Sequence, residues 1–323
     1  MKGNGVLSEP RLSSEVVRAR ILAALGCARK ADVAFVPVSA IDSYLARRAP
    51  AVFLKHDVHN VNPAALIDLA GREAEMGVIG TYFFMSFGHP RGERFYAPAD
   101  QRRMMREVSA MGHEIGAHFD LFYELRHRGK TVRDALREQI ESFAGIAGPI
   151  RVVNLHGNSR FKMVDSEGNN LIYDFFDELA RHSDYPDLRR VPEEFATTIR
   201  RERMSLKELD ITHWGDSWIW SRANGMIATN LISDNWMGKH QELAVTTNTA
   251  DACAYGLNPT MEAGVRDGRH KATWVGVGRT LPTVYAANQF RLKIAGDDVL
   301  RFFADALPAA PFVMLLHPEF YAA

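Results

Sequence analysis

The sequence predicts an α/β fold in which parallel strands alternate with helices. Three observations support this prediction. Short apolar runs alternate along the chain with longer amphipathic segments, which favours strand–helix–strand units with right-handed crossovers. The length of 323 residues suits one large barrel, because such barrels run past about 200 residues as a single domain. No Pro/Gly/Ser-rich linker divides the chain. A barrel and a doubly wound open sheet both fit this alternation.

The expected strands are short and rich in β-branched and aromatic residues, as buried parallel strands usually are. They are "VAFVPV" (33–38), "AVFLKH" (51–56), "VIGTYFFM" (78–85), "HEIGAHF" (113–119), "IRVVNLH" (150–156) and "PFVMLLH" (311–317).

The expected helices are bounded by capping residues and glycines. Ser13 and Gly26 bound the first, Asn62-Pro63 and Gly77 the second, Asp100 and Gly112 the third, and Thr131 caps the fourth; two later helices are expected at 170–182 and 296–307. The segment from about 184 to 285 breaks the alternation and contains all five tryptophans. It is interpreted as long loops at one end of the fold, where binding sites are common. We expect residues 1–50 to pack as N-terminal elements on a barrel formed by residues 51–323.

The composition excludes several classes of protein. A net charge of zero gives no electrostatic support for a nucleic-acid partner. The two cysteines form no CxxC pair or disulfide framework. The first residues lack the apolar core of a secretion signal, and no run of about 18 apolar residues predicts a membrane span. A cytoplasmic, non-membrane protein is therefore expected, with its oligomeric state open.

Four of the expected strands end in histidine. His59 follows the second strand, and His118, His156 and His317 lie at the ends of three others. Ligands bind at the carboxyl ends of strands in parallel α/β folds. A lone histidine is more often structural than functional, but four at one edge predict a metal or acid–base site.

Side-chain alternation divides the ionisable residues further. Asp57 and His59 are two positions apart and should point the same way, as should His118 and Asp120. His56 and His113 should face the opposite side, so we expect these two to be buried structural histidines.

Six segments, in order, resemble the motifs of the polysaccharide deacetylases, carbohydrate esterase family four with the NodB-homology domain. They are "FLKHDVH", "GVIGTYFFM", "GHEIGAHFD", "VVNLHGN", "LISDNW" and "FVMLLHPEFY". The lipopolysaccharide and O-antigen biosynthesis branch is the most similar, and the resemblance covers roughly residues 50–320. It implies a distorted barrel of about seven strands, a divalent metal, and hydrolysis of an N-acetyl group from an amino sugar.

The resemblance also implies roles for individual residues. Asp57 matches the general base, His59 and His118 match metal ligands, and His317 matches the acid that protonates the leaving amine. The family's second motif usually has another histidine four positions after the first, but Phe122 stands there. His156 could replace the missing ligand, and Asp120 is the other candidate.

Further residues are expected around the substrate. Asp120, Asp234, Trp236 and Arg160 are candidate substrate-binding residues. The structural alternatives are a loop cap for Asp120, core packing for Trp236 and a solvated surface position for Arg160. A site rich in histidine suits zinc, with nickel, iron or cobalt as alternatives, better than magnesium. The expected partner is an N-acylated sugar, sugar nucleotide or glycan precursor. Two other functions remain open: a catalytically silent sugar-binding barrel, and an amidase or deformylase acting on another modified sugar.

Overall fold

The structure is a computed structural model, and it describes the chain in segments. The described residues are 13–47, 51–89, 96–120, 123–124, 131–156, 163–164, 189–190, 197, 201, 205–215, 219–221, 225–227, 230–233, 242–248, 257–260, 269–274, 279–286, 289–295 and 312–318. The two helices expected at 170–182 and 296–307 lie outside the described residues.

Three helices begin at side-chain caps that the sequence predicted. Ser13 caps the first, Asn62 Oδ1 accepts hydrogen bonds from the first main-chain N–H groups of the second, and Thr131 Oγ1 caps the helix that starts at Val132. The helix predicted to open at Asp100 begins at Pro98, after Ala97, so Asp100 lies in its first turn and does not cap it. The first helix runs through Gly26, where the sequence predicted its end, and stops four residues later. The helices are α1 (Ser14–Lys30), α2 (Ile41–Arg47), α3 (Pro63–Glu75), α5 (Pro98–Ala110) and α7 (Val132–Ala147), with 3-10 turns η1 (Val38–Ala40) and η2 (Leu206–Leu209).

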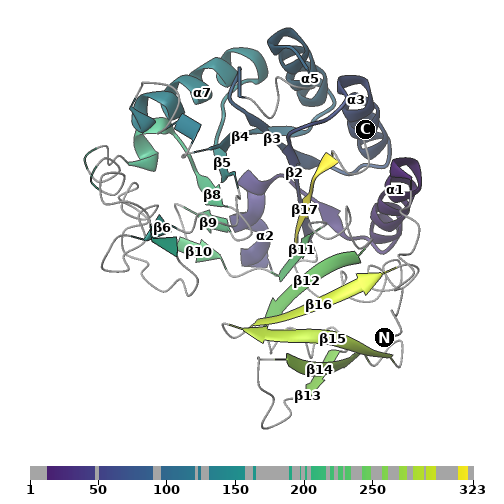
Figure 1. Cartoon of the computed structure of the whole chain (residues 1–323). Helices are drawn as coiled ribbons and strands as arrows, with labels where there is room; N and C mark the ends of the chain where they lie inside the picture. Colours follow the sequence, from purple (N-terminus) through teal and green to yellow (C-terminus); the bar gives the residue numbers. More distant parts are fainter. Residues whose placement is uncertain are drawn as a thin grey trace, which may run out of the picture.

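A curled sheet of parallel strands forms the centre of the molecule (Figure 1). Parallel pairing runs without interruption in the order β11, β17, β2, β3, β4, β5 and β8. Their bounds are β11 (Asn230–Ser233), β17 (Phe312–Leu316), β2 (Ala51–Val58), β3 (Gly80–Met85), β4 (Glu114–Phe119), β5 (Val152–Leu155) and β8 (His213–Gly215). The fold is therefore α/β with a curled, barrel-like sheet, as the sequence predicted.

Shorter strands border this curl. β1 (Ala34–Phe35) pairs in parallel with the start of β2, so the N-terminal elements join the sheet directly. β9 (Ile219–Ser221) and β10 (Gly225–Ile227) continue the sheet beyond β8 in antiparallel fashion. A separate pair is formed by β6 (Met163–Val164) and β7 (Arg189–Arg190). Among the described residues, no helix is long and apolar enough to cross a membrane.

The prediction of long loops between residues 184 and 285 is wrong for much of that segment. An antiparallel extension follows β11 and projects from the curl (Figure 1). It consists of β12 (Glu242–Asn248), β16 (Gln289–Ala295), β15 (Arg279–Ala286), β14 (Arg269–Trp274) and β13 (Leu257–Thr260), paired in that order. Its strands carry more polar residues than the central ones, because antiparallel sheets need not bury both faces.

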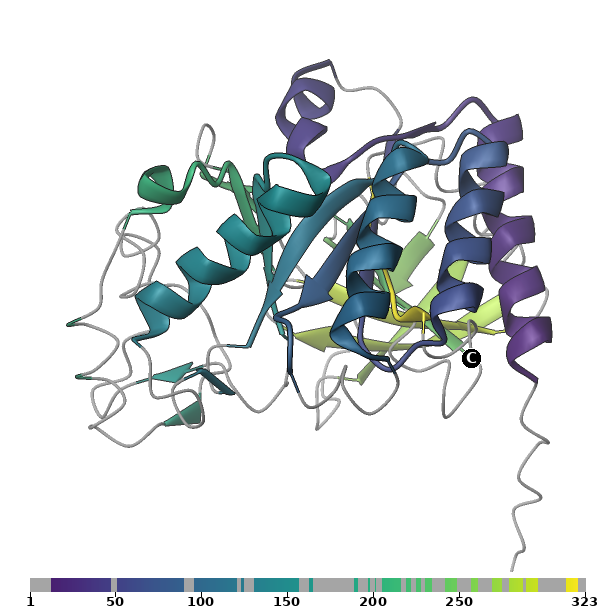
Figure 2. The same ribbon diagram turned by 90° about the horizontal axis from the view of Figure 1, so that it is seen from above.

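The two faces of the parallel sheet bury different clusters. Phe53 of β2, Phe83 of β3 and Val313 of β17 point to the inside of the curl, where they meet Ile41 of α2. Figures 1 and 2 show α2 inside the curl at one end of the strands and the longer helices on the outer face. Residues one position away, such as Tyr82, pack in the outer cluster with α3, α5 and α7. The period of two thus decides which side chains enter the curl.

The 3-10 turn η1 closes the inside of the curl at the starts of the strands. The main-chain N–H of Val38 donates to Thr81 Oγ1 at 2.9 Å, and that of Ser39 donates to Glu114 Oε2 at 3.3 Å. The carboxyl ends of the same strands, where ligands usually bind in parallel α/β folds, lie away from this turn.

His56 and His113 are structural histidines on the outer face, as predicted. The His56 ring lies 3.0 Å from Glu73 of α3, and the Tyr82 hydroxyl donates to the same carboxylate at 2.7 Å. His113 accepts from the first main-chain N–H of β3 at 3.1 Å and lies 2.9 Å from a main-chain carbonyl of α3. Burial lowers the pKa of His113, although the charge of Glu73 opposes this shift. Both histidines therefore fasten α3 to the sheet.

Gly116 in β4 allows the inside of the curl to pack closely beside the strand ends. A Cβ at this position would lie 2.5 Å from the Phe83 ring and 2.9 Å from Val152 Cγ2. Both neighbours are buried and cannot easily move. We expect Gly116→Ala to lower the free energy of unfolding by about 1–3 kcal/mol through overpacking, measured by urea unfolding.

The matched control for this change is Gly145→Ala in α7, where no atom lies within 4 Å of the added Cβ. There the substitution should stabilise the protein by roughly 0.5–1 kcal/mol, because alanine favours helix over glycine. Equal effects of the two substitutions would contradict the close packing at Gly116.

Candidate metal centre

Three buried histidines meet at the ends of neighbouring strands inside the curl. His59 follows β2, His118 lies in β4, and His156 follows β5. One ring nitrogen from each lies within 4.8 Å of the others, a group that could hold a metal ion. The ring centroids are 4.9 to 5.2 Å apart. The sequence predicted this convergence from the strand ends, and the structure brings all three together.

The spacing of the rings fits a shared cation. The Nε2 atoms of His59 and His118 are 2.9 Å apart. Nitrogens bound to one zinc ion at about 2.0–2.1 Å would lie roughly 2.9–3.4 Å apart, depending on the angle at the metal. A ring nitrogen of His156 lies within 4.8 Å of both, and three histidines are the donor set of known catalytic zinc sites, which keep a position open for water.

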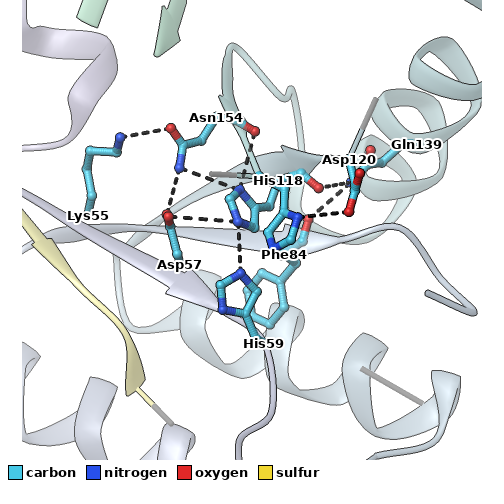
Figure 3. Close-up of polar contacts among 9 residues, drawn as sticks. Lys55, Asp57, His59, Phe84, His118, Asp120, Gln139 and Asn154 are labelled. Carbon is cyan, nitrogen blue, oxygen red and sulfur yellow. Dashed lines mark hydrogen bonds and ion pairs between the residues drawn. The ribbon is translucent and has the colours of Figure 1, made fainter. Parts of the chain in front are cut away.

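His118 is held with Nε2 toward the cluster (Figure 3). Its Nδ1 lies 3.3 Å from the main-chain carbonyl of Asn154. A carbonyl only accepts, so this contact favours a proton on Nδ1 and leaves Nε2 with the lone pair that a metal needs. The side-chain Nδ2 of Asn154 lies farther from the same Nδ1, at 3.5 Å. The side chain of Gln139 from α7 also donates to the main-chain carbonyls of Phe84 and His118, at 3.1 and 3.3 Å. The helix layer thereby fixes the ends of β3 and β4.

His118 is also held in its neutral form. Burial keeps the pKa of His118 well below its usual range, and the neighbouring imidazoles, His59 first, lower it further. A neutral imidazole is the form that binds metals. At neutral pH the ring does not have to lose a proton before it can bind a metal ion.

His156 is oriented by Asp120. The Nδ1 of His156 lies 2.8 Å from Asp120 Oδ2, and His89 lies 3.4 Å from the same oxygen. The other oxygen accepts from the main-chain N–H of Tyr123 at 3.0 Å. Burial would raise the pKa of Asp120, but these hydrogen bonds outweigh it and hold the pKa far below its usual range. Asp120 is thus an ionised partner that fixes Nδ1–H of His156 and leaves Nε2 for a cation.

This arrangement changes the expected role of Asp120. The sequence placed Asp120 among the residues that contact substrate or complete the metal site, whereas the structure engages both of its oxygens with His156, His89 and Tyr123. The residue reaches the cluster only through His156. Contact with a substrate stays a prediction.

Asp57 lies beside the histidines. Its Oδ2 is 3.8 Å from His118 Nε2, too far for a hydrogen bond, and Asn154 Nδ2 donates to its Oδ1 at 2.7 Å. The side chain is buried with only 3% exposed. Asp57 therefore borders the place where three histidine nitrogens converge.

His317 lies beside His59 at the edge of the cluster. It follows β17, which pairs in parallel with β2, and its ring centroid is 5.7 Å from that of His59 at an interplanar angle of 29°. The side chain is half-buried. The four histidines predicted from the strand ends thus surround one space. The other three predicted residues, Arg160, Asp234 and Trp236, lie outside the described residues.

Lys55 and Asn154 belong to the site but were missed in the sequence. Lys55 Nζ donates to Asn154 Oδ1 at 2.9 Å, and Asn154 in turn contacts Asp57. Both are fully buried. The signal was available: Lys55 is two positions before Asp57, and Asn154 is two before His156, so alternation places them on the inner face. His89 lacked any such signal, because it lies in a loop beyond β3.

No protein-family model matches the chain, and no curated protein matches it. Statements about its activity therefore depend on the motifs and on the geometry of the site.

Replacing Asp120 by alanine should weaken metal binding. Without the carboxylate the His156 ring is no longer held in one orientation, and such partners are usually worth about 10- to 100-fold in metal affinity. The test is a competition titration of metal-free protein with zinc and a chromophoric chelator. Asp68→Ala removes a carboxylate that is ion-paired on the surface and should leave affinity unchanged. Equal affinity of Asp120→Ala and wild type would contradict the proposed role.

Proposed function

We propose that the protein is a metal-dependent hydrolase that removes an N-acetyl or similar acyl group from an amino sugar. The observation that carries this proposal is the arrangement of three buried histidines between Asp57 and His317. It provides three imidazoles as cation ligands, a carboxylate and a fourth imidazole close together, which are the groups that amide hydrolysis requires.

His59, His118 and His156 would hold the ion. Their fit is supported by the fixed Nδ1 protons of His118 and His156, which direct lone pairs inward. A bound zinc-type ion supplies Lewis acidity, which makes water acidic at neutral pH and polarises a carbonyl group. The all-nitrogen donor set favours zinc, nickel, iron or cobalt over magnesium.

The protein residues would move the protons. Asp57 is the proposed general base: one carboxylate oxygen accepts a proton from the attacking water, while Oδ1 stays held by Asn154. His317 is the proposed general acid: its imidazolium gives a proton to the amide nitrogen as the C–N bond breaks. Water thus divides between the two products, a carboxylate such as acetate and the free amine.

The substrate class comes from the resemblance to the polysaccharide deacetylases. The ordered motifs favour an N-acetylated sugar, sugar nucleotide or glycan precursor of a surface polysaccharide. In this proposal His156 takes the place of the histidine that Phe122 replaces in the second motif. The position of His156 next to His118 supports this substitution, since their ring centroids are 5.2 Å apart.

The proposal is tested by metal analysis and by acetate release. Purified protein should contain about one divalent ion per chain, and it should release acetate from at least one member of a panel of N-acetylated amino sugars, their nucleotide forms and chitin oligomers. Removing the ion with a chelator should stop the reaction, and adding zinc should restore it. Metal-free protein with full activity would overturn the proposal. Sugar binding without any acyl release would favour a silent binding protein, and release from N-formyl sugars alone would favour a deformylase.

A further inference from the structure

A continuous chain of buried hydrogen bonds connects a lysine inside the curl to Asp57. Lys55 Nζ donates to Asn154 Oδ1 at 2.9 Å, and Asn154 Nδ2 donates to Asp57 Oδ1 at 2.7 Å (Figure 3). The exposed fractions are 1% for Lys55, 0% for Asn154 and 3% for Asp57. Water therefore has little access to these three side chains.

The chemistry of the ammonium group fixes the direction of this chain. An ammonium has three donors and no acceptor, whereas a carboxamide has an accepting oxygen and a donating nitrogen at nearly equivalent positions. Because Lys55 can only donate, Asn154 must turn its oxygen toward Lys55. Its NH₂ group must then face Asp57 and donate to it. If the amide were rotated by 180°, its oxygen would face the Asp57 carboxylate and its NH₂ group would face the Lys55 ammonium. Neither hydrogen bond could then form.

We propose that Lys55, acting through Asn154, is a positioning residue for Asp57. The chain holds Oδ1 of Asp57 in place and leaves Oδ2 on the side of His118, at 3.8 Å from its Nε2. This inference rests on the proposed function, in which Asp57 is the base. Lys55 would act on Asp57 through the amide of Asn154, by holding the carboxylate in one orientation.

The burial of the Lys55 ammonium is not what ordinary packing of a side chain would require. A lysine with 1% exposure is unusual, because an ammonium loses its hydration inside a protein. Phe83 lies 5.3 Å from Nζ and offers a ring face to the charge. A methionine or leucine would fill the same space without that cost. The hydrogen bond to Asn154 gives the buried ammonium a partner and links it to Asp57.

Kinetic analysis of variants tests the chain. Lys55→Met and Asn154→Ala should each lower kcat by about 10- to 100-fold, as loss of outer partners usually does, with KM nearly unchanged. The double variant should be no slower than Asn154→Ala, because in this proposal Lys55 acts on Asp57 through the amide. Asn154→Asp keeps an acceptor for Lys55 but replaces the amide donor by a second carboxyl group, which would share a proton with the Asp57 carboxylate, so it should fold and still lose kcat. Wild-type kcat in Asn154→Asp, or losses that multiply in the double variant, would overturn the proposal.

A second measurement needs neither metal nor turnover. In metal-free protein, the side-chain amide protons of Asn154 are assigned by their disappearance in Asn154→Asp. One of them should resonate downfield and exchange slowly because it is bonded to Asp57, and Lys55→Met should remove both properties. The control Ser109→Ala removes a partly buried hydrogen bond between α5 and α7 and should change neither the amide signal nor kcat. An unchanged Asn154 signal in Lys55→Met would overturn the chain even if the enzyme is active. Absence of acetate release by the wild type would overturn the proposed function and leave this test of the chain valid.

Discussion

Replacement of His118 by alanine is expected to abolish metal binding and turnover together. His118 is 1% exposed, lies 2.9 Å from His59 Nε2, and is kept neutral by burial. Its loss leaves two ligands, so metal affinity should fall by more than the roughly 10- to 100-fold that removal of an outer partner costs. Metal content by mass spectrometry and acetate release measure the two effects.

His113→Gln is the matched control for this change. His113 directly precedes the same strand, is also buried, and faces the outer side, where it contacts α3. This variant should lose stability but keep its metal. Retention of metal and activity in His118→Ala would show that the three histidines do not form the metal site.

Replacement of Asp57 by asparagine should lower kcat by roughly 10²- to 10⁴-fold, the usual contribution of a general base. The substitution keeps the size of the side chain and an oxygen that can accept from Asn154. It removes only the ability to take a proton from water. The metal content should stay at the wild-type level, because three histidines supply the ligands.

The result for metal content decides between two roles of Asp57. If Asp57→Asn loses the metal together with its activity, the carboxylate is a ligand and the base must be another group. A solvent-exposed carboxylate offers a control: Asp100→Asn in the first turn of α5 should leave both kcat and metal content unchanged.

The meeting of the histidines was predicted from the strand ends, and the division into inner and outer residues follows from the period of two. Asp57 and His59 are two positions apart in one segment, and His118 and Asp120 are two apart in another, so each pair should face the same side. His56 is an odd number of positions from Asp57, and His113 is an odd number from His118, so both should face the opposite side. The structure places the first pair on the inner face and the last pair against α3. The side of a strand to which a residue points depends only on its position along that strand, so it could be predicted without knowledge of distant contacts.

The parts that could not be predicted depend on contacts between distant segments. Asp120 should face the same side as His118, but its orientation is decided by His156 and by the turn at Tyr123. The antiparallel extension was interpreted as loops because its strands are rich in polar residues and lack the long apolar runs of buried strands. Such strands are defined by their partners more than by their own composition.

The place of β17 in the sheet has a consequence for how the protein folds. This strand lies between β2 and β11, so residues near position 54 pair directly with residues near position 314. Contacts between such distant parts of a chain form slowly, because the chain loses the entropy of closing a long loop before the contacts can stabilise it. The same strand brings His317 to His59. The cluster of histidines should therefore be completed late in folding, and refolding experiments should recover helix content before they recover metal binding.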